Sequence, residues 1–196
     1  MALTKLNNKA VANVTSIPVA LGDMVLVSSA TASSSASIEF SLGNYKEYKF
    51  FFVNMHPQNN GTNFQFNCST DNGSNYNVVK TTTSFRAYQN EAGTNTSLAY
   101  DAGADLAQST AYQQIMNGVG NDNDQAGSGF LSLYNPSSNI YVKHFMSSCN
   151  ATEGADYTIQ TFYAGYFNDT NDLTNISFKF ASGNIDAGKI LMFGIN

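Results

Sequence analysis

Two histidines, His56 and His144, are the first residues of this chain that could support acid–base chemistry or bind a metal. His56 precedes Pro57 at the end of an expected strand, and His144 lies inside another, so a shared site would need two distant segments to converge. We therefore interpret both as structural histidines. A Gly-x-Ser-x-Gly sequence, which would mark a serine nucleophile, is absent from the chain.

The four glutamates, Glu39, Glu47, Glu91 and Glu153, are the candidate acids of a hydrolase. A glycosidase needs two carboxylates that face each other across the bond to be cut. These four are scattered, none has the flanking aromatic residues typical of a sugar cleft, and the chain has no tryptophan to stack on a sugar ring. We predict no catalytic residues and expect a protein that is not an enzyme, with a hydrolase kept as the third alternative.

The run Asn121-Asp122-Asn123-Asp124 is the segment most similar to a calcium loop, because it offers several oxygen ligands. Counted from Asp122, however, position 5 is Ala126 and no glutamate stands at position 12. We interpret the run as a solvated turn, and leave open whether residues 121–124 bind a cation. Glycine-rich phosphate-binding motifs are also absent, so we predict neither a metal site nor a cofactor.

The two cysteines, Cys68 and Cys149, are far apart in the chain and have no C-x-x-C spacing. This pattern favours two buried free thiols, with a single disulfide as the alternative.

The elements that would position these residues have the period of β-strands. Ala36, Ile38 and Phe40 alternate with polar residues, whereas residues 45–54 are almost continuously apolar, as in a central strand buried on both faces. Residues 24–27 read as a short buried strand, and the Asn72-Gly73 turn predicts a hairpin. Residues 104–116 are ambiguous between a helical turn and a strand. Further strands are expected at 64–68, 78–88, 97–100, 129–135, 139–147, 157–167, 173–181 and 189–195.

This succession of short strands and turns predicts an all-β domain over residues 24–196. The most economical architecture is an antiparallel β-sandwich of jelly-roll or related Greek-key topology, and a closed barrel is the alternative. Residues 1–23 read as an N-terminal attachment arm, in which Leu3, Leu6, Ala10 and Val14 could share one face of a short helix before Pro18 interrupts it.

Charge limits the partners that the chain can have. Only 12% of the 196 residues are charged, about half the usual share, and the net charge is −5. The nine basic residues are scattered, and Arg86 is the only arginine, so we exclude nucleic acid as a partner. The sequence has no apolar run long enough to span a membrane, and its first residues lack the pattern of a secretory signal peptide.

Several motifs carry a resemblance over about residues 24–195. They are Asn54-Met55-His56-Pro57, Tyr134-Asn135-Pro136-Ser137-Ser138 and the segments 24–27, 32–40, 48–50, 71–76, 106–110, 182–190 and 193–195. In these segments the chain resembles a family of tailed-bacteriophage virion proteins frequent in marine and cyanobacterial phages. Residues 1–6 also resemble the start of many phage fibre-like proteins. The resemblance implies a location in the virion, as a tail-fibre or head-appendage protein, and supplies no catalytic residues.

We therefore expect a non-enzymatic virion protein, assembled in the host cytoplasm as a homotrimer. Residues 1–23 would dock it onto a capsid, portal-adaptor or tail protein, and the polar β-sandwich would mediate assembly. The alternative is a module that binds host-surface glycan through loops such as 90–96 or 118–129.

Overall fold

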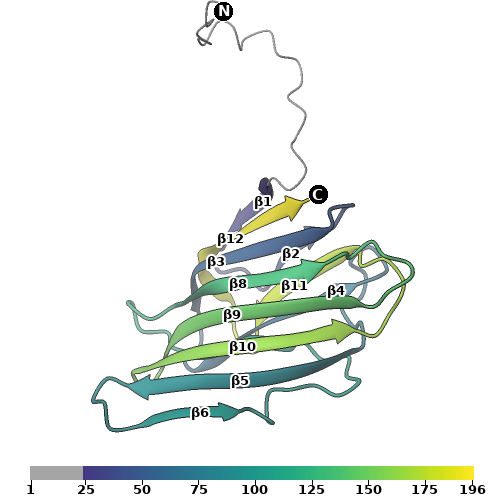
Figure 1. Ribbon diagram of the computed structural model, residues 1–196. Helices are drawn as coiled ribbons and strands as arrows, with labels where there is room; N and C mark the ends of the chain where they lie inside the picture. The colour runs from purple at the N-terminus through teal and green to yellow at the C-terminus, as the bar shows by residue number, and fades with distance from the viewer. Residues whose placement is uncertain (1–23) are drawn as a thin grey trace, which may run out of the picture.

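The computed structural model describes residues 24–196, so the predicted arm of residues 1–23 lies outside the described residues. The described part is all-β, and its strands pair antiparallel, as predicted (Figure 1). The strands are β1 (Met24–Thr31), β2 (Ile38–Ser41), β3 (Glu47–Pro57), β4 (Thr62–Ser69), β5 (Lys80–Asn90), β6 (Thr96–Tyr100), β7 (Gln113–Val119), β8 (Gly127–Tyr134), β9 (Lys143–Glu153), β10 (Tyr157–Phe167), β11 (Asn175–Phe180) and β12 (Ile185–Ile195).

The strands form two layers. The large sheet has the order β1-β12-β3-β8-β9-β10-β5-β6, and the small sheet behind it has the order β2-β11-β4-β7 (Figure 1). A single pairing, Val119 with Glu153, joins β7 to β9, so the strands make one nearly closed sheet that is folded into a sandwich.

Eight of these strands have jelly-roll connectivity. Without β5, β6, β9 and β10, the layers read β1-β12-β3-β8 and β2-β11-β4-β7, which is the double Greek-key order of a jelly roll. The hairpin-like pairs β5-β6 and β9-β10 are insertions between β4 and β7 and between β8 and β11. Both insertions extend the large sheet, which therefore runs beyond the edge of the small one.

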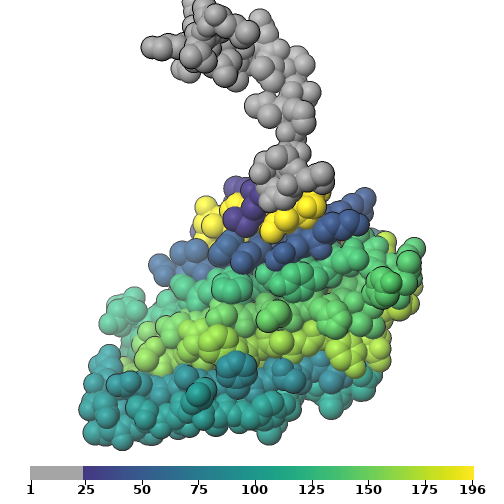
Figure 2. Space-filling view, viewed as in Figure 1, coloured from purple at the N-terminus to yellow at the C-terminus, as the bar shows by residue number. Residues whose placement is uncertain are grey.

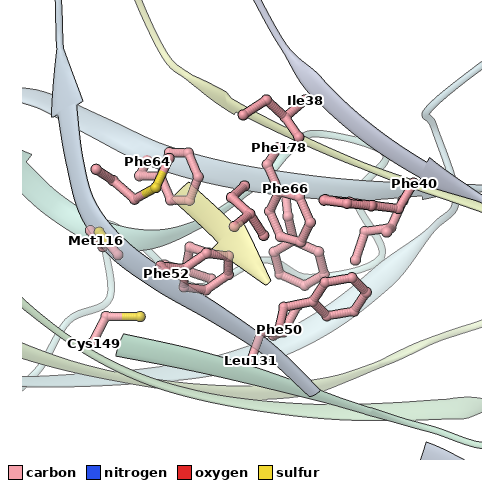
Figure 3. Close-up of a cluster of buried hydrophobic side chains, with 14 of the residues drawn as sticks. Ile38, Phe40, Phe50, Phe52, Phe64, Phe66, Met116, Leu131, Cys149 and Phe178 are labelled. Carbon is pink, nitrogen blue, oxygen red and sulfur yellow. The ribbon is translucent and has the colours of Figure 1, made fainter. Parts of the chain in front are cut away.

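Aromatic side chains fill the space between the layers (Figure 3). Phe50 and Phe52 point inward from the large sheet and meet Phe64 and Phe178 of the small sheet, where Phe66 packs against Phe178. The ring centroids of Phe178 and Phe52 lie 5.2 Å apart in an edge-to-face arrangement, which aromatic pairs favour. Alternation along each strand places these rings on one face, so the predicted period of two is what builds this core.

Two lysines lie inside the sandwich, each bound to main-chain oxygens. The Lys80 ammonium donates to the carbonyl of Ala111 at 2.6 Å. The Lys143 ammonium donates to the carbonyls of Asp169 and Asn171 and so holds the loop before β11. Both side chains have no exposed surface, and burial lowers the pKa of each.

Two predictions about burial are wrong. Residues 24–27 are not a buried strand, because β1 is the edge of the large sheet and the Leu26 side chain is 52% exposed. β3 is a central strand, but it is buried on one face only: Phe50 and Phe52 are in the core, Phe51 is half-buried and Val53 is exposed. No segment of residues 24–196 covers the second face of this strand.

The predicted hairpin at residues 71–74 is also wrong. The turn itself forms, with Asn72 and Gly73 at positive φ and the Asp71 carboxylate accepting hydrogen bonds from Ser69 Oγ and the Asn75 amide. The strands on either side, however, lie in different sheets, since β4 pairs with β7 and β11 while β5 pairs with β6 and β10. Local turn chemistry sets the bend but not the strand that follows it.

The ambiguous region 104–116 consists of turns followed by β7, which begins at Gln113.

Among residues 24–196, no helix has the length and apolarity needed to cross a membrane.

Candidate assembly surface

The outward face of the large sheet carries a row of aromatic and apolar side chains. Strand register places the row across β12, β3, β8, β9, β10, β5 and β6, because directly paired residues of antiparallel strands share a face. The row consists of Leu191, Phe51, Phe130, Ser148, Phe162, Phe85 and Tyr100. We call this row the aromatic row.

The rings of the aromatic row contact one another along the surface. Phe85 and Phe162 stack with centroids 4.7 Å apart, and Phe51 packs near Phe130. Phe85 nevertheless stays 46% exposed, and Tyr100 also belongs to the exposed residues. Stacked rings left in water expose apolar area that a monomeric protein usually hides.

A second row lies beside the aromatic row and is nearly free of charge. It consists of Phe193, Lys49, Ser132, Met146, Ala164 and Thr83. Lys49 is the single charged side chain in the two rows, and its ammonium lies 4.5 Å from the centroid of the Phe130 ring. A partner could cover these rows with little loss of ion hydration, because the one charge already rests on an aromatic face.

Small residues leave a hollow at one end of this face. Ala164 and Thr83 lie between the larger Met146, Tyr134 and Tyr166, and the resulting cavity is about 460 Å³ in volume. The cavity is lined mainly by side chains of β5, β9 and β10. A protruding apolar side chain of a partner would fit into it.

The face is large enough for a stable interface. The eight strands span seven spacings of about 4.8 Å, and seven residues of a strand span about 24 Å, so the whole outward face measures at most roughly 800 Å², since β6 has only five residues. This face includes Glu47 and Lys189, which lie outside the two rows. Stable protein interfaces bury about 800 Å² on each partner. Figure 2 shows this side of the molecule, with the strands in one continuous surface from β12 to β5 and β6.

The comparisons with known proteins give no relative. No protein-family model matches the chain, and no curated protein or solved structure is similar to it. The resemblance to phage virion proteins therefore stays a prediction.

The two histidines do not meet. His56 follows Met55 on β3. Met55 pairs with Gly127 of β8, which in turn pairs with Ala151 of β9, so His56 lies level with the region of Ala151. His144 is seven residues before Ala151 on β9. The two rings are thus separated by about 20 Å along the strands. His56 Nδ1 lies 2.7 Å from the Gln125 carbonyl oxygen, and His144 packs beside the ring of Tyr166 on the outward face.

The four glutamates are distributed over both sheets. Glu39 lies on β2 of the small sheet, where Ser37 Oγ donates to it, and Glu47 begins β3 of the large sheet. Glu91 follows β5 and Glu153 ends β9, and these two line separate hollows. Of the four, only Glu153 lies in a cleft with tyrosines and an arginine around it.

Residues 121–124 lie in the connection between β7 and β8. Asn121 binds Gln58 and Asn60 through hydrogen bonds, and the Asp122 carbonyl accepts from the Gln125 amide. Among residues 24–196, three or more His, Cys, Asp or Glu side chains nowhere gather as they would around a metal ion.

Cys68 and Cys149 are both buried free thiols. Burial raises the pKa of each, to about 12 for Cys149, so neither is a ready nucleophile at neutral pH.

The sequence interpretation missed the outward face. The signal was present: residues 50–53 are all apolar, and Phe85, Phe130 and Phe162 interrupt otherwise polar positions. We interpreted the apolar run as burial within one chain, although burial by a second chain leaves the same pattern.

Proposed function

We propose that this chain is a non-enzymatic structural protein of a bacteriophage particle, a tail-fibre or capsid-appendage subunit that self-associates through the outward face of its large sheet. The observation that supports self-association is the aromatic row, which runs across seven strands and is left uncovered by residues 24–196. The phage assignment depends on the sequence resemblance, and the jelly-roll fold agrees with it.

The partner on this face is a second copy of the chain. The two rows hold one charged side chain, so they can meet their own copy with little like-charge repulsion. An arginine-rich partner would find no counter-charge in these rows, and an acidic partner would find only Lys49. The hollow beside Met146 accepts a protruding side chain of a neighbouring copy. We expect three copies around a three-fold axis, in which the outward face of each copy contacts both neighbours, with a mass three times the 21.1 kDa of the chain.

Replacing Phe85 and Leu98 by asparagine tests this proposal. Leu98 pairs with Ala87, two residues after Phe85 on β5, so it lies on the same outward face as Phe85. Both side chains are exposed in the single chain, Leu98 by 74%, so the domain should fold without them. Burying two asparagines in the interface would leave their amides without partners, and we expect at least a tenfold weaker association. Light scattering coupled to size-exclusion chromatography measures the mass, and circular dichroism reports the retained β structure.

Ile140→Asn is the matched control, because Ile140 is 70% exposed but lies in the connection between β8 and β9. This variant should assemble like the natural protein. A protein that is monomeric both at full length and without residues 1–20, or a double variant that still assembles, would show that the face is not a self-association surface.

Removing residues 1–20 separates docking from assembly. If these residues form the arm that attaches the protein to a capsid, portal-adaptor or tail protein, the shortened chain should still oligomerise but should be missing from purified particles. Immunoblotting of particles gives the result. A chain that is monomeric at full length and associates only after the deletion would instead mean that its own N-terminal residues cover the outward face.

A further inference from the structure

A second surface lies on the opposite side of the large sheet, where this sheet extends beyond the small one. The inward residues near the start of β5 are buried under the small sheet, but Arg86 and Tyr88 further along the strand are only half-buried. Together with Asn117 of β7, Glu153 of β9 and Tyr157 of β10, they line an open cleft of about 220 Å³. The two insertions thus create a cleft that the eight jelly-roll strands alone would not have.

Two tyrosines give the cleft its apolar walls. Tyr88 and Tyr157 lie edge to face with ring centroids 5.7 Å apart, so they present surfaces at a steep angle to each other. Asn95 Nδ2 donates to the Tyr157 hydroxyl at 3.0 Å and so fixes this ring. Rigid rings with a polar tip suit a ligand that has both C–H surfaces and hydroxyls.

Arg86 is held as a fixed donor beside these rings. Its Nε lies 3.3 Å from Asp101 Oδ2, and its Nη1 donates to Asn117 Oδ1 at 3.1 Å. The guanidinium group also lies 5.8 Å from the centroid of the Tyr88 ring. The fork geometry of arginine leaves its remaining N–H groups free to bind a pair of adjacent hydroxyls.

Glu153 supplies the matching acceptor. Its Oε2 accepts a hydrogen bond from the Ala155 amide, which orients the carboxylate and leaves further lone pairs for a ligand. Arg86 is already neutralised by Asp101, so Glu153 makes the cleft slightly negative. An anionic ligand is therefore disfavoured, and a neutral one is not.

We propose that this cleft binds one neutral sugar ring of a surface polysaccharide, with Tyr88 and Tyr157 against its C–H faces and Arg86 and Glu153 on its hydroxyls. The cleft volume is below the roughly 300–1,000 Å³ of sites for drug-sized ligands, which suits a single ring. Asn95 belongs to the 90–96 loop, one of the two loops for which the sequence predicted glycan contacts. The site is separate from the outward face, so its failure would leave the assembly proposal intact.

Saturation-transfer NMR with the full-length protein tests the site. The probes are the methyl glycosides of glucose, galactose, mannose and N-acetylglucosamine, each at millimolar concentration, with glucuronate as the acidic comparison. At least one neutral glycoside should give a signal, and Glu153→Gln and Tyr88→Ala should each weaken its binding at least tenfold. Glu153→Gln keeps the shape of the side chain, so weaker binding by this variant would not result from misfolding.

Tyr141→Ala is the matched control, because Tyr141 is an exposed tyrosine in a distant loop, and it should bind like the natural protein. Absence of signal from all four neutral probes would overturn the proposal, as would a stronger signal from glucuronate. Binding that survives both cleft variants would place the sugar elsewhere and would overturn it as well.

Discussion

Phe178→Ala is expected to lower the free energy of unfolding by about 3–5 kcal/mol, the typical loss when a buried phenylalanine is truncated. Phe178 has no exposed surface, and its ring lies against Phe40, Phe50, Phe52, Phe64 and Phe66 with centroids 5.2–6.3 Å away. Because these rings come from both layers, the surrounding structure cannot collapse into the vacated space without moving one sheet against the other. Urea unfolding followed by circular dichroism measures the change.

Phe178→Leu is the comparison for this substitution. It keeps most of the apolar volume and should cost less than about 1.5 kcal/mol. A loss below 1 kcal/mol for the alanine variant would mean that the two layers do not meet through Phe178.

Lys80→Met is expected to make the protein more stable, by about 2 kcal/mol at pH 7. Burial lowers the pKa of Lys80 from 10.5 to about 8, while the nearby Cys68 acts in the opposite direction to a smaller extent. This difference corresponds to about 3 kcal/mol of destabilisation by the buried charge at neutral pH. Methionine has a similar length, and the loss of the hydrogen bond to the Ala111 carbonyl offsets about 1 kcal/mol of the gain.

Lys80→Met should also remove the contribution of Lys80 to the pH dependence of the free energy of unfolding. Between pH 8 and 10.5 the unfolded chain holds more protons on Lys80 than the folded protein, so the contribution of Lys80 to the free energy of unfolding rises with pH in this window. From pH 7 to 9.5 the natural protein should gain about 2 kcal/mol from this group, and Lys80→Met should lack the gain. The contribution of Lys80 is read as the difference between the two proteins, because the raised pKa values of the buried Cys68 and Cys149 thiols lower the stability of both once the unfolded thiols ionise in the same window. The range stops at 9.5 because the raised pKa of Tyr163, about 12, lowers stability further once unfolded tyrosines ionise.

Lys46→Met serves as the control, since Lys46 is exposed at the start of the β3 region and should keep the pH dependence of the natural protein. If the free energy of unfolding changed equally with pH in the natural protein and in Lys80→Met, the lowered pKa of Lys80 would be contradicted. The single salt bridge among residues 24–196 joins Arg86 to Asp101, so within this part of the chain no carboxylate neutralises Lys80.

The sequence was sufficient to predict the fold class and most of the strands, although β7 was left ambiguous and the strand expected at 139–147 is β9, Lys143–Glu153. Alternation at Ala36, Ile38 and Phe40 and the β-branched and aromatic residues of 157–167 reflect the pleat of a strand, which is a local property. The prediction for 157–167 coincides with the bounds of β10. The scarcity of charge is likewise a property of composition, and it holds whatever the fold.

The sequence alone could not decide which chain covers an apolar strand face. Period two says that Phe51 and Val53 lie opposite Phe50 and Phe52, but it does not say how many layers the chain provides. The tertiary structure gives two layers and leaves the outward side of the large sheet uncovered by residues 24–196. The prediction of a hairpin around Asn72-Gly73 was wrong for a related reason. A turn is set by local residues, whereas strand pairing depends on the whole topology.

The sugar cleft depends even more on tertiary structure. Arg86, Tyr88, Asn117, Glu153 and Tyr157 come from four strands, and no spacing in the sequence joins them. They converge because β10 pairs with both β5 and β9, and because the two insertions extend the large sheet past β7. Residue type and period determined by themselves that this is an all-β chain with few charged residues. Only long-range register decided which side chains meet and which face is left for a partner.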